Sequence, residues 1–151
     1  MTNLIGSIGG GLTTFPRYNF VYMNTATPTP NPLVYDTVLY GSSPYMSYNN
    51  TTGIWTALAT GGFDVKVSWT AILAGTLNNY INVYINGLQV DSGGFAQGYG
   101  GDSYLSNWII KYSNTFLMIE GDTFNFGSFI SANLALGIGA GNWASIYYRG
   151  R

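Results

Sequence analysis

The sequence predicts a single all-β domain, and three observations carry the prediction. Short runs rich in aromatic and β-branched residues recur along the chain, separated by Gly, Pro, Asn and Asp. No segment shows a sustained helical period with capping residues at its ends. With 151 residues, 46% of them hydrophobic and 17% aromatic, the chain can fill the core of one ordinary domain. Roughly eight to ten short strands in one domain indicate a sandwich or a barrel.

The first residues differ in composition from the rest. Residues 1–14 are a lead-in in which Gly9, Gly10 and Gly11 favour coil, and residues 15–151 are the predicted domain. The lead-in is either a disordered N-terminus or a segment that docks against a neighbour. It lacks the basic region of a signal peptide. We therefore expect export by another route, release by lysis as part of a virion, or expression without a leader.

The expected strands are bounded by turn signals. Three alternating prolines at 28–32 predict a loop or an edge segment, because proline donates no ladder hydrogen bond. The glycine-rich stretch 91–103 predicts a long loop, and 120–123 a turn. The predicted strands are 18–23, 33–40, 45–48, 54–58, 63–73, 81–85, 88–90, 104–112, 116–119, 124–130 and 143–149.

Two local patterns are the most informative. Asn86–Gly87 follows an alternating run and predicts a tight hairpin, because both residues tolerate positive φ. Strict alternation from residue 63 predicts a strand with one buried face and one wet or interface face. The expected buried face holds Phe63, Val65, Val67 and Trp69, and the other face holds Asp64, Lys66 and Ser68.

The charge content excludes several classes of partner. Charged residues make up 7% of the chain, against a typical share of about 25%. The net charge is −1, and no basic arm or patch is present. We therefore expect no nucleic-acid partner and no electrostatic membrane binding. No apolar run reaches the roughly 18 residues of a membrane helix, so we expect no membrane insertion. A polar, uncharged surface suits a protein engaged by other subunits.

The side chains that usually carry catalysis are scarce, so we expect neither an enzyme nor a cofactor. The chain has no histidine and no cysteine, which removes a common general base, thiolate ligands and disulfides. Six carboxylates are scattered, and no nucleophile or phosphate-loop motif is present. We expect no resident metal; the candidate ligands for calcium are Asp91, Asp102 and Asp122 with loop carbonyls.

Several short motifs follow one another in a fixed order along the chain. They are Tyr48, Thr52–Gly53, Trp55–Thr56, Gly62–Phe63, Asn86–Gly87, Leu117–Asp122 and Trp143–Tyr147. In order and spacing, over about residues 17–149, the chain resembles the globular heads of complement C1q and tumour necrosis factor, although the printed sequence holds no collagen-like repeat before them. The resemblance implies a ten-stranded antiparallel jelly roll of two sheets that forms a compact homotrimer with aromatic residues along its threefold axis.

Two sets of aromatic residues are candidate contact residues. Phe95, Tyr99 and Tyr104 lie in or beside the glycine-rich stretch, where exposed rings favour contact with a sugar or a protein. The alternative for Phe95 is packing beneath its own loop. The second set sits in strand patterns and is expected in the core or at the trimer interface: Tyr48, Trp55, Trp69, Trp143 and Tyr147.

The leading functional hypothesis is a trimeric surface module of a virus or phage particle. As a spike, head fibre or decoration protein it would bind the capsid or a receptor, either protein or glycan, on the host surface, and its location would be the virion surface. One alternative is a secreted, extracellular recognition head from a collagen-like protein. Another is a small jelly-roll protein that builds a capsid.

Overall fold

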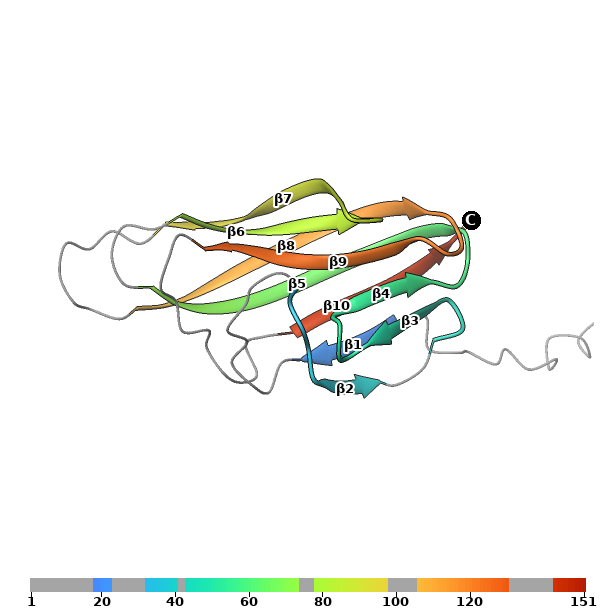
Figure 1. Cartoon of the computed structure of the whole chain (residues 1–151), viewed down its shortest axis with the longest axis horizontal. Helices are drawn as coiled ribbons and strands as arrows, with labels where there is room; N and C mark the ends of the chain where they lie inside the picture. The colour runs from blue at the N-terminus through green and yellow to red at the C-terminus, as the bar shows by residue number, and fades with distance from the viewer. Residues whose placement is uncertain (1–17, 23–31, 41–42, 74–77, 98–105, 131–142) are drawn as a thin grey trace, which may run out of the picture.

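The structure is a computed structural model that describes residues 18–22, 32–40, 43–73, 78–97, 106–130 and 143–151 (Figure 1). These residues form ten strands and no helix, so none of them provides a helix long and apolar enough to cross a membrane. The strands are β1 (Tyr18–Tyr22), β2 (Thr37–Tyr40), β3 (Met46–Asn49), β4 (Ile54–Ala57), β5 (Gly61–Leu73), β6 (Asn78–Ile85), β7 (Leu88–Gln97), β8 (Ser106–Met118), β9 (Thr123–Ile130) and β10 (Trp143–Gly150).

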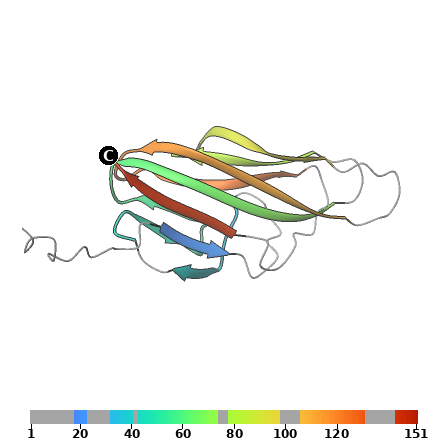
Figure 2. The ribbon, with the colours of Figure 1, turned by 180° about the vertical axis from the view of Figure 1, so that it is seen from behind.

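The strands make two five-stranded antiparallel sheets packed face to face. The first sheet has the order β2-β1-β10-β5-β8 and the second has the order β3-β4-β9-β6-β7. The first and last strands of the chain are neighbours, as the blue and red arrows of Figure 2 show. Only β1 and β2, β3 and β4, and β6 and β7 are consecutive strands of one sheet, and every other connection between consecutive strands crosses from one sheet to the other. The predicted two-sheet, all-β architecture is confirmed.

The core lies between the sheets and is filled by alternate residues of each strand. On β5, Phe63, Val65 and Val67 are at most 1% exposed, as the alternation predicted. Ser68 corrects the prediction: it belongs to the outward series but is only 2% exposed. Stacked aromatic rings continue the core into the second sheet, where Trp55 is fully buried.

The irregular segment that precedes β2 covers part of the core beside the second sheet. Strand 33–40 was predicted, but only Thr37–Tyr40 is strand, and the residues before it run as an irregular strap. Leu33 and Tyr35 on this strap are fully buried. Leu33 donates its backbone N–H to the Phe126 carbonyl (2.6 Å), and Tyr35 donates its own to the Tyr48 hydroxyl (2.7 Å). These two hydrogen bonds take the place of regular strand pairing before Thr37. Composition alone does not distinguish such a segment from a strand, so it predicted a strand that is too long.

The hairpin predicted at Asn86–Gly87 is present, and a second tight turn spans residues 49–53. Asn86 and Gly87 have φ values of 50° and 79°, which is the left-handed pair that a two-residue type I′ hairpin requires. The turn 49–53 ends on Gly53 with φ 71°, and the Gly53 N–H donates to the Asn49 carbonyl at 2.9 Å. The Asn49 side chain accepts further hydrogen bonds from the N–H groups of Thr51 and Thr52. The local sequence therefore determines both turns.

Two other predicted elements are wrong. β7 continues to Gln97, so the predicted loop 91–103 is strand over its first residues. β8 is one strand, not two, because it pairs with β5 without interruption from Ser106 to Met118. The polar residues that suggested a break in β8 are tolerated because 113 and 115 are exposed, and Asn114 donates to Asp91.

The glycines of β7 allow this strand to fold closely over β8. A Cβ atom at Gly93 would lie 2.9 Å from the Tyr112 ring, and one at Gly94 would lie 2.5 Å from the Lys111 carbonyl oxygen. Gly94 also has a left-handed backbone, with φ 69°. The stretch that looked like a flexible loop is therefore a strand whose glycines are required by close packing.

Gly94→Ala is expected to destabilise the protein more than Gly87→Ala. Each alanine would be held in a left-handed conformation that costs about 1–2 kcal/mol. Only Gly94 adds a clash, because nothing lies within 4 Å of a Cβ at Gly87. Urea unfolding of both variants measures the two losses. Equal losses would contradict the close packing of β7 on β8.

Candidate functional site

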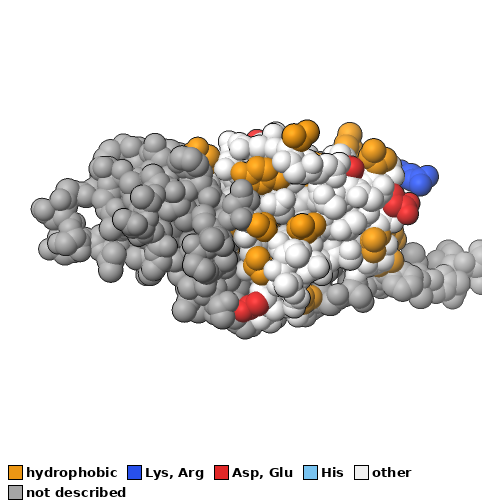
Figure 3. All heavy atoms as spheres, in the orientation of Figure 1, with side chains coloured by type: hydrophobic (Ala, Val, Ile, Leu, Met, Phe, Trp, Pro, Cys, Tyr) orange, Lys and Arg blue, Asp and Glu red, His pale blue; other side chains and the backbone are white. Residues whose placement is uncertain are grey.

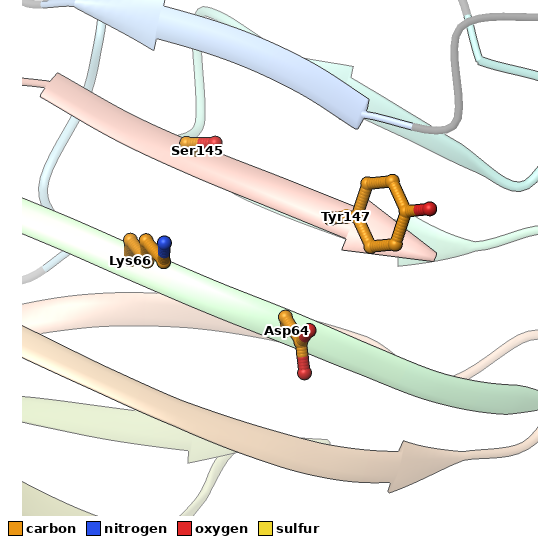
Figure 4. A pocket seen from close by; sticks show the side chains of 4 residues that line it. All are labelled: Asp64, Lys66, Ser145 and Tyr147. Atoms are coloured by element: carbon orange, nitrogen blue, oxygen red, sulfur yellow. The ribbon is translucent and has the colours of Figure 1, made fainter. Parts of the chain in front are cut away.

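The outer face of the first sheet carries a shallow depression at its centre (Figure 4). Asp64 and Lys66 of β5 and Ser145 and Tyr147 of β10 line it, and its volume is about 370 Å³. The antiparallel register places Tyr147 opposite Asp64 and Ser145 opposite Lys66. All four residues point outward because their neighbours along each strand fill the core. We call this hollow the Tyr147 depression.

A second hollow adjoins the first and shares Lys66 with it. Lys111 and Ser113 of β8 and Trp143 of β10 also border this space of about 210 Å³, which we call the Lys66 depression. The register places Ser113 opposite Lys66, so Lys111 is the diagonal neighbour of Lys66. Both lysines of the chain therefore lie on one hollow of one sheet.

The carboxylate beside these lysines is already engaged. Asp64 accepts a hydrogen bond from the Thr115 hydroxyl at 2.6 Å and pairs with the Arg149 guanidinium at 3.4 Å. Arg149–Asp64 is the only ion pair between described residues, and with side chains 61% and 31% exposed it adds under about 1 kcal/mol of stability. Lys66 and Lys111 have no such partner within the described part of the chain.

A second polar cluster joins the two sheets at the β7–β8 edge. Asp91 of β7 accepts hydrogen bonds from the Tyr112 hydroxyl at 2.5 Å and the Asn114 amide at 2.7 Å, both on β8. These bonds lower the pKa of the Asp91 carboxyl, the Tyr112 bond most. Burial, with a further contribution from Asp91, raises the pKa of the Tyr112 hydroxyl. The Asp91 cluster is thus a clamp between the sheets, with Tyr112 held as a donor.

Comparisons with known proteins agree with this architecture. No family profile matches the sequence, and no curated protein matches it. The Eiger tumour necrosis factor of S. frugiperda superposes with a TM-score of 0.66 at 10% identity, covering 88% of this chain and 92% of that one. The globular domain of the zebrafish complement 1qA protein superposes with a TM-score of 0.61 at 12% identity, covering 89% and 98%.

The chain has the tumour necrosis factor and complement C1q jelly-roll fold. The resemblance that the sequence motifs indicated is therefore confirmed at the level of the fold. Its Asn86–Gly87 hairpin, its turn 49–53 and its closing strand β10 all lie where the motifs placed them.

The structure divides the predicted core or interface aromatics into two groups. Trp55 is fully buried and its ring contacts that of the partly buried Tyr48, whose hydroxyl donates to the Tyr35 carbonyl, so both belong to the core. Trp143 is half-buried and Tyr147 is 41% exposed, and both lie on the outer face of the first sheet. The Trp69 side chain lies outside the described residues, although its backbone is part of β5.

The structure describes only part of the predicted ligand-binding loop. Phe95 belongs to β7, which corrects its assignment to a loop, and its side chain is outside the described part. Tyr99 and Tyr104 lie outside the described residues. Their proposed role in ligand contact therefore remains a prediction.

The calcium candidates are engaged by donors of the protein itself. Asp91 accepts the clamp hydrogen bonds, while Asp122 accepts from the Asn86 amide and the Ile119 N–H, both at 2.8 Å. Asp102 lies outside the described residues. Within the described ranges no three His, Cys, Asp or Glu side chains come together as a metal site.

Asp91→Asn is expected to reduce stability by about 1 kcal/mol at neutral pH, because Tyr112 loses a charged acceptor. The folded-state pKa of Asp91 lies below the unfolded value of about 3.9. Its contribution is therefore present above that value and lost as the pH falls through the folded pKa. Unfolding curves measured between neutral and acid pH should show that the variant loses less stability on acidification than the wild type.

Asp64→Asn is the matched control for this prediction. It removes the same charge from a pair on the surface rather than from the clamp between the sheets. The clamp is refuted if Asp91→Asn leaves both the neutral stability and the acid profile of the wild type unchanged.

Proposed function

We propose that this chain is a non-enzymatic binding module that works as a homotrimer, with the outer face of the first sheet at the subunit interface. The observation that carries the proposal is the fold, since the resemblance to tumour necrosis factor and complement heads implies threefold assembly. The proposal needs no cofactor. The partners are two further copies of the chain and one ligand outside the trimer.

The outer face of the first sheet has the chemistry of an interface. Beside the charged Asp64, Lys66 and Lys111, the two depressions at its centre are lined by small or aromatic residues, which are Ser113, Ser145, Trp143 and Tyr147. Aromatic and small polar side chains permit close contact between subunits, and aromatic rings are enriched in such contacts. Figure 3 views the opposite side of the molecule, that of the second sheet, where few charged side chains lie on the described surface.

A threefold interface joins two different patches, because the same patch cannot meet itself around a threefold axis. The end of β8 supplies an apolar candidate for the second patch. Leu117 is 87% exposed and Ile119 is 64% exposed, which is high for large apolar side chains that close a strand. Burial of these residues against a neighbouring face favours assembly.

We place the trimer on the surface of a virus or phage particle, as a spike, head fibre or decoration protein that binds the capsid or a host receptor. A charged share of 7% and the absence of cysteine support a surface covered by assembly and a core stable without disulfides. The alternative that the structural neighbours favour is an extracellular recognition head. A small capsid-building jelly roll is the third possibility. Portal or capsid genes beside the coding sequence would support the virion role, whereas a collagen-like coding segment would support the secreted head.

Ser145→Arg is expected to convert the trimer to monomers. Ser145 lines the Tyr147 depression, so an arginine there introduces bulk and an unpaired charge where subunits would meet. Light scattering coupled to gel filtration measures the mass. Ser47→Arg is the control, because Ser47 is exposed on β3 of the other sheet. The proposed interface is contradicted if the wild type is monomeric or if both variants stay trimeric.

Phe95→Ala and Tyr99→Ala are expected to abolish ligand binding by the trimer, and Tyr104→Ala to weaken it. Loss of one aromatic anchor typically costs a binding site about 2 kcal/mol or more, which is about thirtyfold in affinity. A glycan array and a capsid pull-down provide the readouts. Leu88→Ala is the matched control, since Leu88 is 72% exposed at the other end of β7. Unchanged binding by both Phe95→Ala and Tyr99→Ala would discard this site.

A further inference from the structure

The first sheet is positively charged, whereas the chain as a whole carries a small negative charge. Its five strands contain three cationic residues, Lys66, Lys111 and Arg149, and one carboxylate, Asp64. The sheet therefore carries a net charge of +2 in a chain whose net charge is −1. Since Asp64 is engaged by Arg149 and Thr115, the excess charge is that of the two lysines.

Both lysines border the same hollow. Lys66 and Lys111 are diagonal neighbours on adjacent strands, a position that places Cβ atoms about 7 Å apart. Two flexible ammonium groups at that separation can converge on one anion placed between them. Ser113 adds a hydroxyl donor on the same border, and the Trp143 ring closes one side. Among the described residues, no carboxylate lines this depression.

Assembly makes the excess charge costly. In the proposed homotrimer the outer face of the first sheet loses water, and burial of an ammonium group without a counter-charge is strongly unfavourable. A bound anion with several acceptor oxygens offsets that cost, because charge-assisted hydrogen bonds are the strongest available to lysine. The depression of about 210 Å³ exceeds the ~30 Å³ share of one water several times, so it has room for a four-oxygen anion.

We propose that the Lys66 depression binds a tetrahedral oxyanion, phosphate or sulfate, between Lys66 and Lys111. The cost argument rests on the proposed trimer, whereas the hollow and its two lysines are present in a single chain. Within the trimer interface such an anion is a free ion held as a structural counter-charge, whereas on the open face of a single chain it can equally be the sulfate group of a sugar. The binding chemistry is the same in both cases.

The test is a titration of the full chain with inorganic sulfate and with inorganic phosphate, at constant ionic strength maintained with chloride. The melting temperature of the wild type is expected to rise and saturate. Lys66→Gln and Lys111→Gln should each weaken the apparent affinity by about tenfold or more, and Lys66→Arg should restore most of it. A parallel titration with a sulfated monosaccharide distinguishes the sources: tighter binding of the sugar assigns a glycan subsite, and tighter binding of the free ion assigns a counter-ion site.

Arg151→Gln is the control, because it removes one positive charge from the exposed C-terminal residue outside the depression. The inference is overturned if the response of the wild type does not saturate, or if Arg151→Gln loses as much affinity as the lysine variants. Light scattering on the same samples separates this inference from the proposed function. Saturable sulfate binding by a monomer refutes the trimer alone, and a trimer without saturable binding refutes the oxyanion site alone.

Discussion

The ladder between β5 and β8 is the constraint on which the other parts of the structure depend. It pairs 13 consecutive residues, from Gly61 opposite Met118 to Leu73 opposite Ser106. Its inward residues build one wall of the core, and its outward residues align Lys66 with Ser113 and Lys111 with Ser68. The free edge of β8 presents Tyr112 to Asp91 of β7, which joins the second sheet to the first. A shift of one residue in this ladder would exchange the core face with the outer face.

The core compensates for polar atoms that it leaves without partners. The Tyr35 hydroxyl, the Trp55 indole N–H and the Asn82 side-chain oxygen are buried and have no hydrogen-bond partner among the described residues. Each such group costs about 1–3 kcal/mol. Ring contacts help to offset this cost, because Trp55 lies 4.3 Å from Tyr48 and 5.7 Å from Phe124 between ring centroids. Burial of aliphatic side chains from both sheets adds to this stabilisation.

Features that depend on neighbouring residues were predictable from the sequence, and features that depend on register were not. The hairpin at Asn86–Gly87 follows from two residues that accept positive φ. The stretch around Gly94 was predicted as a loop. Glycine is required there because the Lys111 carbonyl approaches closely, and Lys111 lies on another strand, so the local sequence does not indicate the contact. The proximity of Lys66 to Lys111 likewise follows only from the register between β5 and β8. Alternation indicated that Lys66 faces outward, but nothing local indicated what it faces.

The charge distribution also bears on the symmetry of any assembly. In a twofold dimer through the outer face of the first sheet, the cationic faces of both copies would be buried against each other. Like charges brought together away from water repel strongly. A threefold arrangement is different, since the face meets another patch of the neighbouring copy. The exposed end of β8 offers Leu117 and Ile119, followed by the exposed carboxylate of Glu120. An apolar edge with one negative charge complements a cationic face, so the two lysines are more compatible with the proposed threefold arrangement than with a twofold dimer.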